Sequence, residues 1–298
     1  MSPSAVRRER ALWCLNLDAE DELRHGLGYT PRQATLAAVA AARAGALSLL
    51  APGDVLLDDA PTAAHTGRVG LSWCPTPTAL ARLRAAGARV PPAPDLATLQ
   101  RVNASRFTYD VLGARLSGAV VVTEFDEAKS WLEARSPEDP VWLKRAFGAA
   151  GRGKLRAMGG ELAAHTRAFL SPLELSLGVV LEPDVRITLE VSQHGFVTED
   201  GSLETGVPVV TQVERGRFVS VRSAQPRELE PAEITALRST LERVAGALHA
   251  AGYFGPFGID AYRYADAHGR TRWNPCGELN ARYTMGYALG MADRPATE

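Results

Sequence analysis

The feature that most constrains the fold is the alternation of strand-like and helix-like segments in the first hundred residues. Residues 11–17 (ALWCLNL) form an apolar run typical of a buried strand, and similar short runs follow at 53–59 and 68–74. Thr30 before Pro31, and Thr76 before Pro77, give the cap-then-proline pattern that starts a helix. The order strand, helix, strand, strand, helix predicts a small α/β unit with a largely parallel sheet.

The remainder of the chain mixes strands and helices less regularly. The proline-rich segment 91–94 predicts a boundary near residue 100. Beyond it, helical patterns alternate with apolar runs, and a long helical pattern over 231–251 precedes two strand-like segments, GIDAYRY and GELNARY. We therefore expect α+β structure after the N-terminal α/β unit.

Charge and cysteine content exclude several classes of function. The net charge of the 298 residues is -1, from 33 basic and 34 acidic side chains. This balance excludes a bulk electrostatic hold on nucleic acid or an anionic membrane, although a local basic patch stays open. The apolar stretch 34–51 is interrupted by Arg43, which indicates a water-exposed helix, not a membrane span. Three scattered cysteines suit a reducing compartment, so we expect a cytoplasmic protein without nucleic-acid or membrane partners.

A glycine-rich stretch at residues 144–154 is a candidate phosphate-binding loop. A predicted strand ends in Lys144, and Gly148, Gly151 and Gly153 follow with backbone N–H groups that no Cβ shields. Only three lysines occur in the chain, and Lys144 and Lys154 flank this stretch. A solvated hairpin turn explains the composition about equally well.

The same stretch also matches the core of a P-loop, from Gly148 to Lys154. However, Leu155 stands where a P-loop places a Ser or Thr hydroxyl for Mg²⁺. The next segment contains Gly159 and Gly160, which disfavour the helix that a P-loop requires. We therefore disfavour a P-loop at this position.

Two carboxylates and an amide form a candidate metal site near the C-terminus. Asp260 lies in one strand-like segment, and Glu278, Asn280 and Arg282 alternate in the next. Because alternate residues of a strand face the same side, these three would share a face, and a suitable hairpin would add Asp260. Such hard oxygen ligands suit Mg²⁺ when nucleotide phosphates complete the coordination. The alternative is an exposed sheet face on which Glu278 and Arg282 form an ordinary ion pair.

An acidic run, Asp18 to Glu22, follows the first strand. At the carboxyl end of a strand it could receive a substrate amine. A solvated helix start, favoured by the helix dipole, explains the run more simply.

Together these features resemble the ATP-grasp superfamily, preceded by a module like the pre-ATP-grasp domain. The resemblance covers about residues 100–290, and its closest part is GYFGPFGIDAYRY followed by GELNARYTMG. It implies an ATP-grasp fold, in which two α+β subdomains grip ATP. The expected division is an N-terminal α/β domain over 1–100, a lid subdomain with the glycine-rich loop over 101–185, and a core subdomain with the metal site over 186–298.

The resemblance also implies roles for individual residues. Lys144 would bind the nucleotide phosphates, with the loop carrying Gly148, Gly151 and Gly153 closing over them. Arg106 stands where many members have a further lysine. The hinge strand would meet adenine and ribose through Glu182, Asp184 and Val185. The Mg²⁺ ligands (Mn²⁺ being the alternative ion) would be Asp260, Glu278 and Asn280, and Arg282 would contact an acyl-phosphate.

The activity implied by the resemblance is that of an ATP-dependent carboxylate–amine ligase. Its substrates would be a small carboxylate and an amine, amino acids included, joined through an acyl-phosphate with release of ADP and phosphate. Two alternatives stay open: a regulatory protein that binds Mg-ATP without ligating, and a phosphotransferase that uses the same site on a hydroxyl acceptor. The oligomeric state is also open, and a homo-oligomer is compatible with the sequence.

Overall fold

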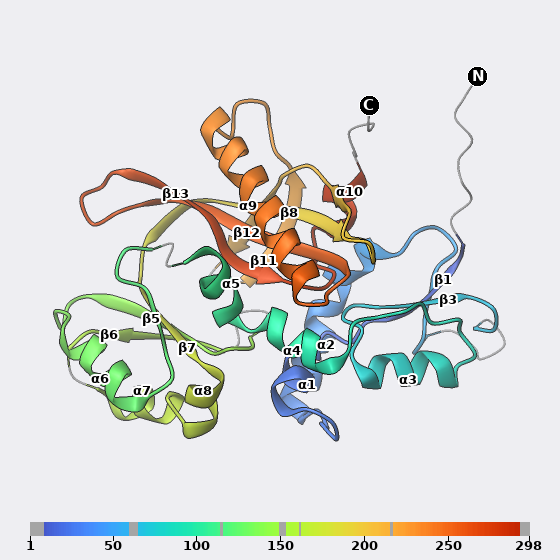
Figure 1. Cartoon of the computed structure of the whole chain (residues 1–298), viewed down its shortest axis with the longest axis horizontal. Coiled ribbons are helices and arrows are strands. Elements are labelled where there is room, and N and C mark those ends of the chain that lie inside the picture. The colour runs from blue at the N-terminus through green and yellow to red at the C-terminus, as the bar shows by residue number, and fades with distance from the viewer. Residues whose placement is uncertain are drawn as a thin grey trace.

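The computed structural model describes residues 9–59, 65–113, 116–148, 153–160, 162–214 and 217–292. Their strands form three sheets that occupy separate regions of the molecule (Figure 1). Because the mixed α/β and α+β architecture follows the expected order along the chain, the predicted fold class is confirmed.

The N-terminal sheet is small and entirely parallel. Its strands are β1 (Ala11–Cys14), β2 (Val55–Leu56) and β3 (Val69–Ser72), in the order β2-β1-β3. The accompanying helices are α1 (Ala19–His25), α2 (Gln33–Ala46), the short 3-10 helix η1 (Leu47–Leu49) and α3 (Pro77–Ala85). Thr76 precedes α3 as expected, but α2 begins at Gln33, so the predicted cap at Thr30 is wrong: Thr30 and Pro31 lie in the preceding loop.

The second sheet is antiparallel, with the order β4-β7-β5-β6. Its strands are β4 (Val120–Val122), β5 (Pro140–Lys144), β6 (Lys154–Met158) and β7 (Val179–Pro183), and α6 (Phe125–Glu133), α7 (Ala164–Phe169) and α8 (Pro172–Leu177) accompany them. Val141 and Leu143 of β5 point into an apolar core, so Lys144 lies on the opposite face. Lys154 begins a strand instead of a helix, which excludes the P-loop alternative.

The third sheet carries the longest hairpin of the described chain. Its order is β11-β10-β8-β12-β13, and β9 pairs with β8. The strands are β8 (Arg186–Val197), β9 (Leu203–Thr205), β10 (Val209–Glu214), β11 (Arg217–Ser223), β12 (Gly255–Ala265) and β13 (Thr271–Asn280). Helix α9 (Pro231–Ala250) packs on β8 and β13, and α10 (Tyr287–Ala292) follows the sheet.

Helices α4 (Leu96–Asn103) and α5 (Ser105–Leu112) connect the first and third sheets. Leu99, Val102 and Phe107 are buried in one apolar core with Trp13 of β1 and Phe257 of β12. A separate apolar core lies under the second sheet. The second sheet is therefore packed as a unit of its own, while the boundaries at residues 100 and 185 stay predictions.

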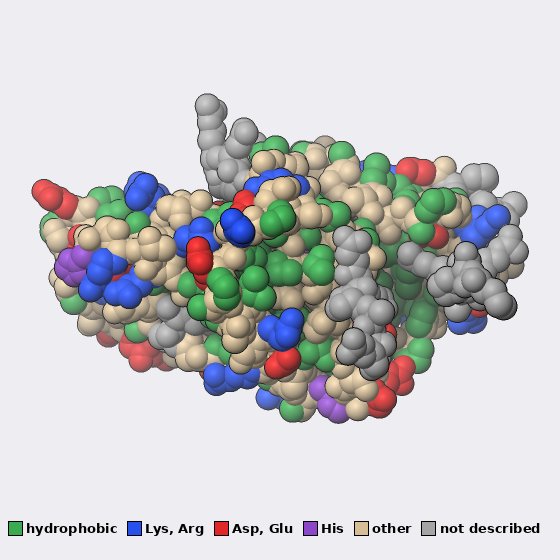
Figure 2. Space-filling model, turned by 90° about the horizontal axis from the view of Figure 1, so that it is seen from above, with side chains coloured by type: hydrophobic (Ala, Val, Ile, Leu, Met, Phe, Trp, Pro, Cys, Tyr) green, Lys and Arg blue, Asp and Glu red, His purple; other side chains and the backbone are tan. Residues whose placement is uncertain are grey.

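The surface agrees with the near-neutral composition. On the face seen in Figure 2, basic, acidic and apolar side chains are interspersed among the described residues. None of the helices in the described ranges combines the length and apolarity that a membrane crossing requires.

Candidate functional site

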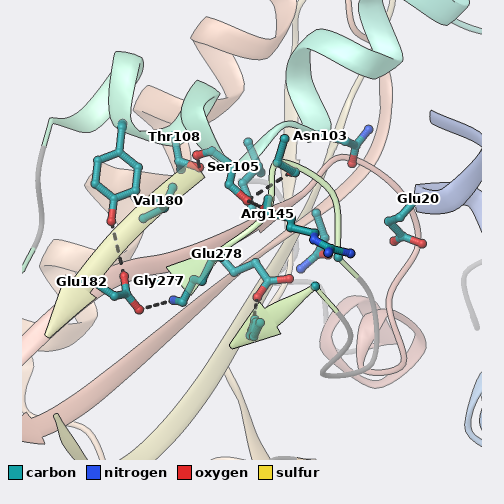
Figure 3. A pocket seen from close by; sticks show the side chains of 17 residues that line it. Glu20, Asn103, Ser105, Thr108, Arg145, Val180, Glu182, Gly277 and Glu278 are labelled. Atoms are coloured by element: carbon teal, nitrogen blue, oxygen red, sulfur yellow. Dashed lines mark hydrogen bonds and ion pairs between the residues drawn. The ribbon is translucent and has the colours of Figure 1, made fainter. Parts of the chain in front are cut away.

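A pocket lies between the second and third sheets, and α4, α5 and Glu20 of α1 complete its wall (Figure 3). Three of its lining side chains are acidic and three are basic. The acidic ones are Glu20, Glu182 and Glu278, and the basic ones are Lys144, Arg145 and Lys154. A pocket with both signs of charge on facing walls suits a ligand that itself carries both signs.

The β12–β13 hairpin brings the three predicted metal ligands together. Asp260 and Glu278 are directly paired across the two strands. Asn280 donates from Nδ2 to Asp260 Oδ2 at 3.1 Å, and the Ser192 hydroxyl of β8 donates to Asp260 Oδ1 at 2.5 Å. A bulge follows Asp260 in the ladder. The predicted juxtaposition of these side chains is therefore present, while their role as ligands stays a prediction.

The chemistry of this donor set fits a hard divalent cation that arrives with further oxygen ligands. No three His, Cys, Asp or Glu side chains converge as a metal cluster within the described ranges. Two carboxylates and an amide alone are a weak set for Mg²⁺, which prefers six oxygens and shares its coordination with substrate phosphates.

The two carboxylates have opposite pKa shifts. Burial, reinforced by the nearby Glu278 carboxylate, raises the pKa of Asp260 to about 6. Burial also acts to raise the pKa of Glu278, but Lys154, with Lys144 and Arg282, outweighs burial and holds that pKa below its ordinary value. The pair thus carries unequal proton affinities, as two carboxylates forced into one site must.

Two lysines of the second sheet enter the pocket side by side. Lys144 and Lys154 are directly opposed across the β5–β6 ladder, so their side chains share one face. Lys144 forms an ion pair with Glu182 of β7, and Lys154 donates to Glu278 Oε2 of the third sheet at 2.9 Å. The second contact joins the two sheets across the pocket.

The predicted hinge residues divide between the pocket and its surroundings. Glu182 is only 7% exposed, lines the pocket and accepts a hydrogen bond from the Tyr109 hydroxyl at 3.3 Å. Asp184 lies after β7 and accepts from Trp142 Nε1 at 3.0 Å and from Arg156 Nε at 2.7 Å. Asp184 and Val185 are outside the set of residues that line the pocket.

Arg106 is not brought to the pocket. It pairs with Asp110 one turn along α5 and lies on a separate surface cleft between α5 and α9. Ser105, Thr108 and Tyr109 of α5 line the pocket instead. Arg106 follows Ser105 by one residue, and a helix rotates by about 100° per residue, so its side chain leaves the pocket face.

The glycine-rich loop borders the pocket at both of its described ends. Gly148 and Gly153 line the pocket, and Gly151 lies outside the described residues. The Arg145 N–H donates to the Gly153 carbonyl at 2.8 Å, which closes the base of the loop. Gly153 has φ +79°, and a Cβ there would lie 3.0 Å from the Phe147 carbonyl oxygen. Both the backbone angle and the close contact favour glycine at this position.

Arg282 lies beyond β13, which ends at Asn280, so the expectation that it continues the strand face is wrong. Its guanidinium is buried against Trp73 and forms an ion pair with Glu20 of the N-terminal unit. The alternative of a Glu278–Arg282 pair is also excluded, because Glu278 pairs with Lys154.

The sequence did not predict a role for Arg145, which forms an ion pair with the buried Glu174. Glu174 of α8 is fully buried, with Arg145 Nε at 3.3 Å and an ion pair to Arg24 of α1. This carboxylate connects the second sheet with the N-terminal unit. The only sequence signal was a cap pattern, Ser171 before Pro172, that gave no hint of the partners.

No family model matches the chain, and no curated protein matches it. Solved structures do. The D-alanyl-alanine synthetase A from Vibrio cholerae O1 biovar eltor is 13% identical with a TM-score of 0.54, over 94% of this chain and 90% of that one. An N5-carboxyaminoimidazole ribonucleotide synthetase in complex with ADP is 14% identical with a TM-score of 0.51, over 96% and 76%.

A biotin carboxylase from Campylobacter jejuni gives a TM-score of 0.54 at 13% identity, over 76% of this chain. The chain spans about half the length of the biotin carboxylases that it matches, 52% and 55% of them. At identities this low, the structural similarity establishes a shared fold and nothing finer. The resemblance predicted from the loop and the hairpin is confirmed at the level of the fold.

Proposed function

The chain has the ATP-grasp fold, and from this premise we propose that it is an ATP-dependent carbon–nitrogen ligase. It would join a small carboxylate to an amine through an acyl-phosphate, with release of ADP and phosphate. One observation carries the proposal: Glu278, paired with Asp260 on the third sheet, contacts Lys154 of the second sheet, and Lys154 lies opposite Lys144. This contact would place a cation site beside an anion site.

A polyphosphate that carries a divalent cation meets both requirements of this pocket. Lys144 and Lys154 are like charges directly opposed on neighbouring strands, an arrangement that is unfavourable without an anion between or beside them. Asp260 and Glu278 are likewise opposed like charges. In the structure Glu182 and Glu278 provide the lysines with partners. Phosphate oxygens would replace these partners, leaving Glu278 to the cation and Glu182 to the nucleoside.

The chain's own residues then have distinct tasks. Lys144 would bind the β- and γ-phosphates, and the loop bearing Gly148 and Gly153 would cover them and exclude water. Glu182, held by Tyr109, would contact the nucleoside. When bound, Mg²⁺ would supply charge neutralisation at the phosphates. Asp260, Glu278 and Asn280 are the residues that would hold it.

The proposed reaction has two displacements. A substrate carboxylate oxygen attacks the γ-phosphorus, the bond to the β–γ bridging oxygen breaks, and ADP leaves with that electron pair. An amine nitrogen then attacks the acyl carbon, phosphate leaves, and the amine loses a proton. Arg282 would stabilise negative charge on the acyl-phosphate. Positioning and charge neutralisation accomplish this chemistry, so no side-chain nucleophile is needed.

The names of the structural neighbours support the reaction class. A D-alanyl-alanine synthetase and a carboxyaminoimidazole ribonucleotide synthetase are both named as synthetases, and the second was solved with ADP. The substrates of this chain are a proposal at the level of chemical class only.

The decisive experiment is a screen for ADP release with pairs of carboxylates and amines, followed by the mass of the product. An amide product with stoichiometric ADP is expected, and Glu278→Ala should abolish it, whereas Glu204→Ala, on the separate strand β9, serves as the matched control. ADP with a stable phosphorylated alcohol would identify a phosphotransferase. Tight Mg-ATP binding without ADP from any pair would identify a regulatory binder.

A further inference from the structure

The contact between Lys154 and Glu278 is the direct link between the glycine-rich loop and the candidate metal site. Lys154 is the first residue of β6, immediately after Gly153, and Glu278 lies in β13 of the other sheet. Their charged atoms are 2.9 Å apart, and 34% and 36% of the two side chains is exposed. The ion pair is thus partly solvated and can exchange partners.

Lys154 occupies one oxygen of the Glu278 carboxylate, Oε2, in the structure. A divalent ion bound to that carboxylate would lie within a few ångströms of the Lys154 ammonium. Repulsion between the two cations would be substantial in a partly buried pocket. The ammonium must therefore move to another anion.

An alternative position for the ammonium lies beside Lys144. The two lysines are opposed on one face of the β5–β6 ladder, so an anion bound by Lys144 is also within reach of Lys154. Gly148 and Gly153 border the same part of the pocket.

We propose that Lys154 is a positioning residue that exchanges Glu278 for the nucleotide phosphates when a divalent cation binds at Glu278. The ammonium competes with the cation for the carboxylate and then holds the phosphates beside Lys144. This inference rests on the proposed function, since it requires a nucleotide site.

The test compares Lys154→Met with Lys129→Met. Lys129 is the one other lysine of the sequence besides Lys144 and Lys154, and it forms an ordinary ion pair with Glu133 on helix α6. It therefore controls for loss of a lysine and its salt bridge. Mn²⁺ alone is the first probe, and its binding is measured from the free-ion signal in electron paramagnetic resonance. A non-hydrolysable ATP analogue with saturating Mn²⁺ is the second. Thermal unfolding verifies that each variant is folded.

Lys154→Met should bind Mn²⁺ alone more tightly, by about two- to five-fold, the range that release of a partly exposed ion pair permits. The same variant should bind the ATP analogue less tightly, and Lys129→Met should change neither affinity. Lys154→Arg should restore both values toward wild type, because a guanidinium also competes for Glu278. An additional Glu278→Gln change should remove the gain in Mn²⁺ affinity.

Equal or weaker Mn²⁺ binding by Lys154→Met, with wild-type protein binding both probes, would overturn the exchange and leave the proposed function standing. Equal binding of the ATP analogue would likewise overturn it. If wild-type protein binds neither Mn²⁺ nor the analogue, the proposed function and the exchange both fail. If Lys154→Met does not fold, Lys154→Gln provides the same comparison with a polar side chain.

Discussion

Asp260 and Glu278 are direct partners across the β12–β13 ladder, and a hydroxyl and an amide fix one of the two carboxylates. Ser192 and Asn280 each donate to a different oxygen of Asp260, which orients it before any cation arrives. Preorganised oxygens bind a hard cation more tightly than mobile ones. The carboxylate charge of Asp260 should therefore contribute strongly to metal affinity.

Asp260→Asn should lower Mn²⁺ affinity by roughly tenfold or more, because the charge of the ligands sets the affinity for hard cations. The side chain keeps its size, so the fold should persist. Asp266→Asn is the matched control, since Asp266 lies in the turn of the same hairpin and pairs with Arg270 and Arg272. Isothermal titration calorimetry measures the Mn²⁺ affinity of both variants. Unchanged affinity in Asp260→Asn would remove Asp260 from the metal site.

A second prediction concerns the buried pair of Arg282 and Glu20. Removal of one member leaves the other charge buried without compensation, so Arg282→Met should destabilise the protein by about 3–5 kcal/mol. The double variant Glu20→Gln/Arg282→Met should recover a large part of that loss. Urea unfolding provides the free energies.

The same pair of variants separates stability from catalysis. If Arg282 stabilises the acyl-phosphate, ligation should stay lost in the double variant although the fold is restored. Recovery of activity together with stability would show that Arg282 acts only through the fold.

The sequence predicted the fold well because its strongest signals are local. The apolar runs around Trp13 and Val69, and the helix start at Thr76, depend on period and capping within a few residues. The alternation around Asp260 and Glu278 likewise follows from the strand period. The start of α2 was misplaced because Thr30 and Pro31 match a cap pattern, whereas the helix begins after Arg32, whose side chain makes no cap hydrogen bond. The ends of helices are the least determined feature of a sequence.

The site was predicted less completely, because contacts between sheets leave no periodic trace. Nothing near Lys154 in the sequence indicates Glu278, and nothing near Glu174 indicates Arg24 or Arg145. Arg106 illustrates the opposite failure. Its position in the chain suited the resemblance, but the phase of α5 turns it toward α9. Such residues become visible only when the elements are placed in three dimensions.

A third prediction concerns pH and the buried His194. Its ring is fully buried, with Nε2 2.7 Å from the Thr284 hydroxyl and three glycines packed around it, and burial lowers its pKa from 6.5 to about 3. Below pH 6.5 the unfolded chain therefore binds a proton that the folded protein excludes. This side chain's contribution to stability should fall as the pH decreases from 6.5 toward 3, by at most about 1.4 kcal/mol per pH unit.

Carboxylates also titrate in this pH range. The test therefore compares the pH dependence of the unfolding free energy between variants and wild type. His194→Gln should show a smaller loss of unfolding free energy between pH 7 and pH 5 than wild type, whatever its stability at pH 7. His268→Gln, at an exposed position in the β12–β13 turn, should follow wild type. Parallel curves for His194→Gln and wild type would mean that His194 is not excluded from protonation in the folded state.

The last prediction distinguishes a glycine needed for close approach from one needed only for its backbone angle. Gly153 and Gly269 have similar positive φ values, +79° and +75°, so alanine should cost each about 1–2 kcal/mol of strain. A Cβ at Gly269 meets no atom within 4 Å, whereas a Cβ at Gly153 meets the Phe147 carbonyl oxygen at 3.0 Å and Gly148 Cα at 3.1 Å. Only Gly153→Ala should therefore displace the base of the glycine-rich loop. The affinity of Gly153→Ala for an ATP analogue, measured by fluorescence titration, should fall severalfold, while Gly269→Ala should retain wild-type affinity. If the two variants bind the analogue equally well, the loop base does not contribute to the nucleotide site.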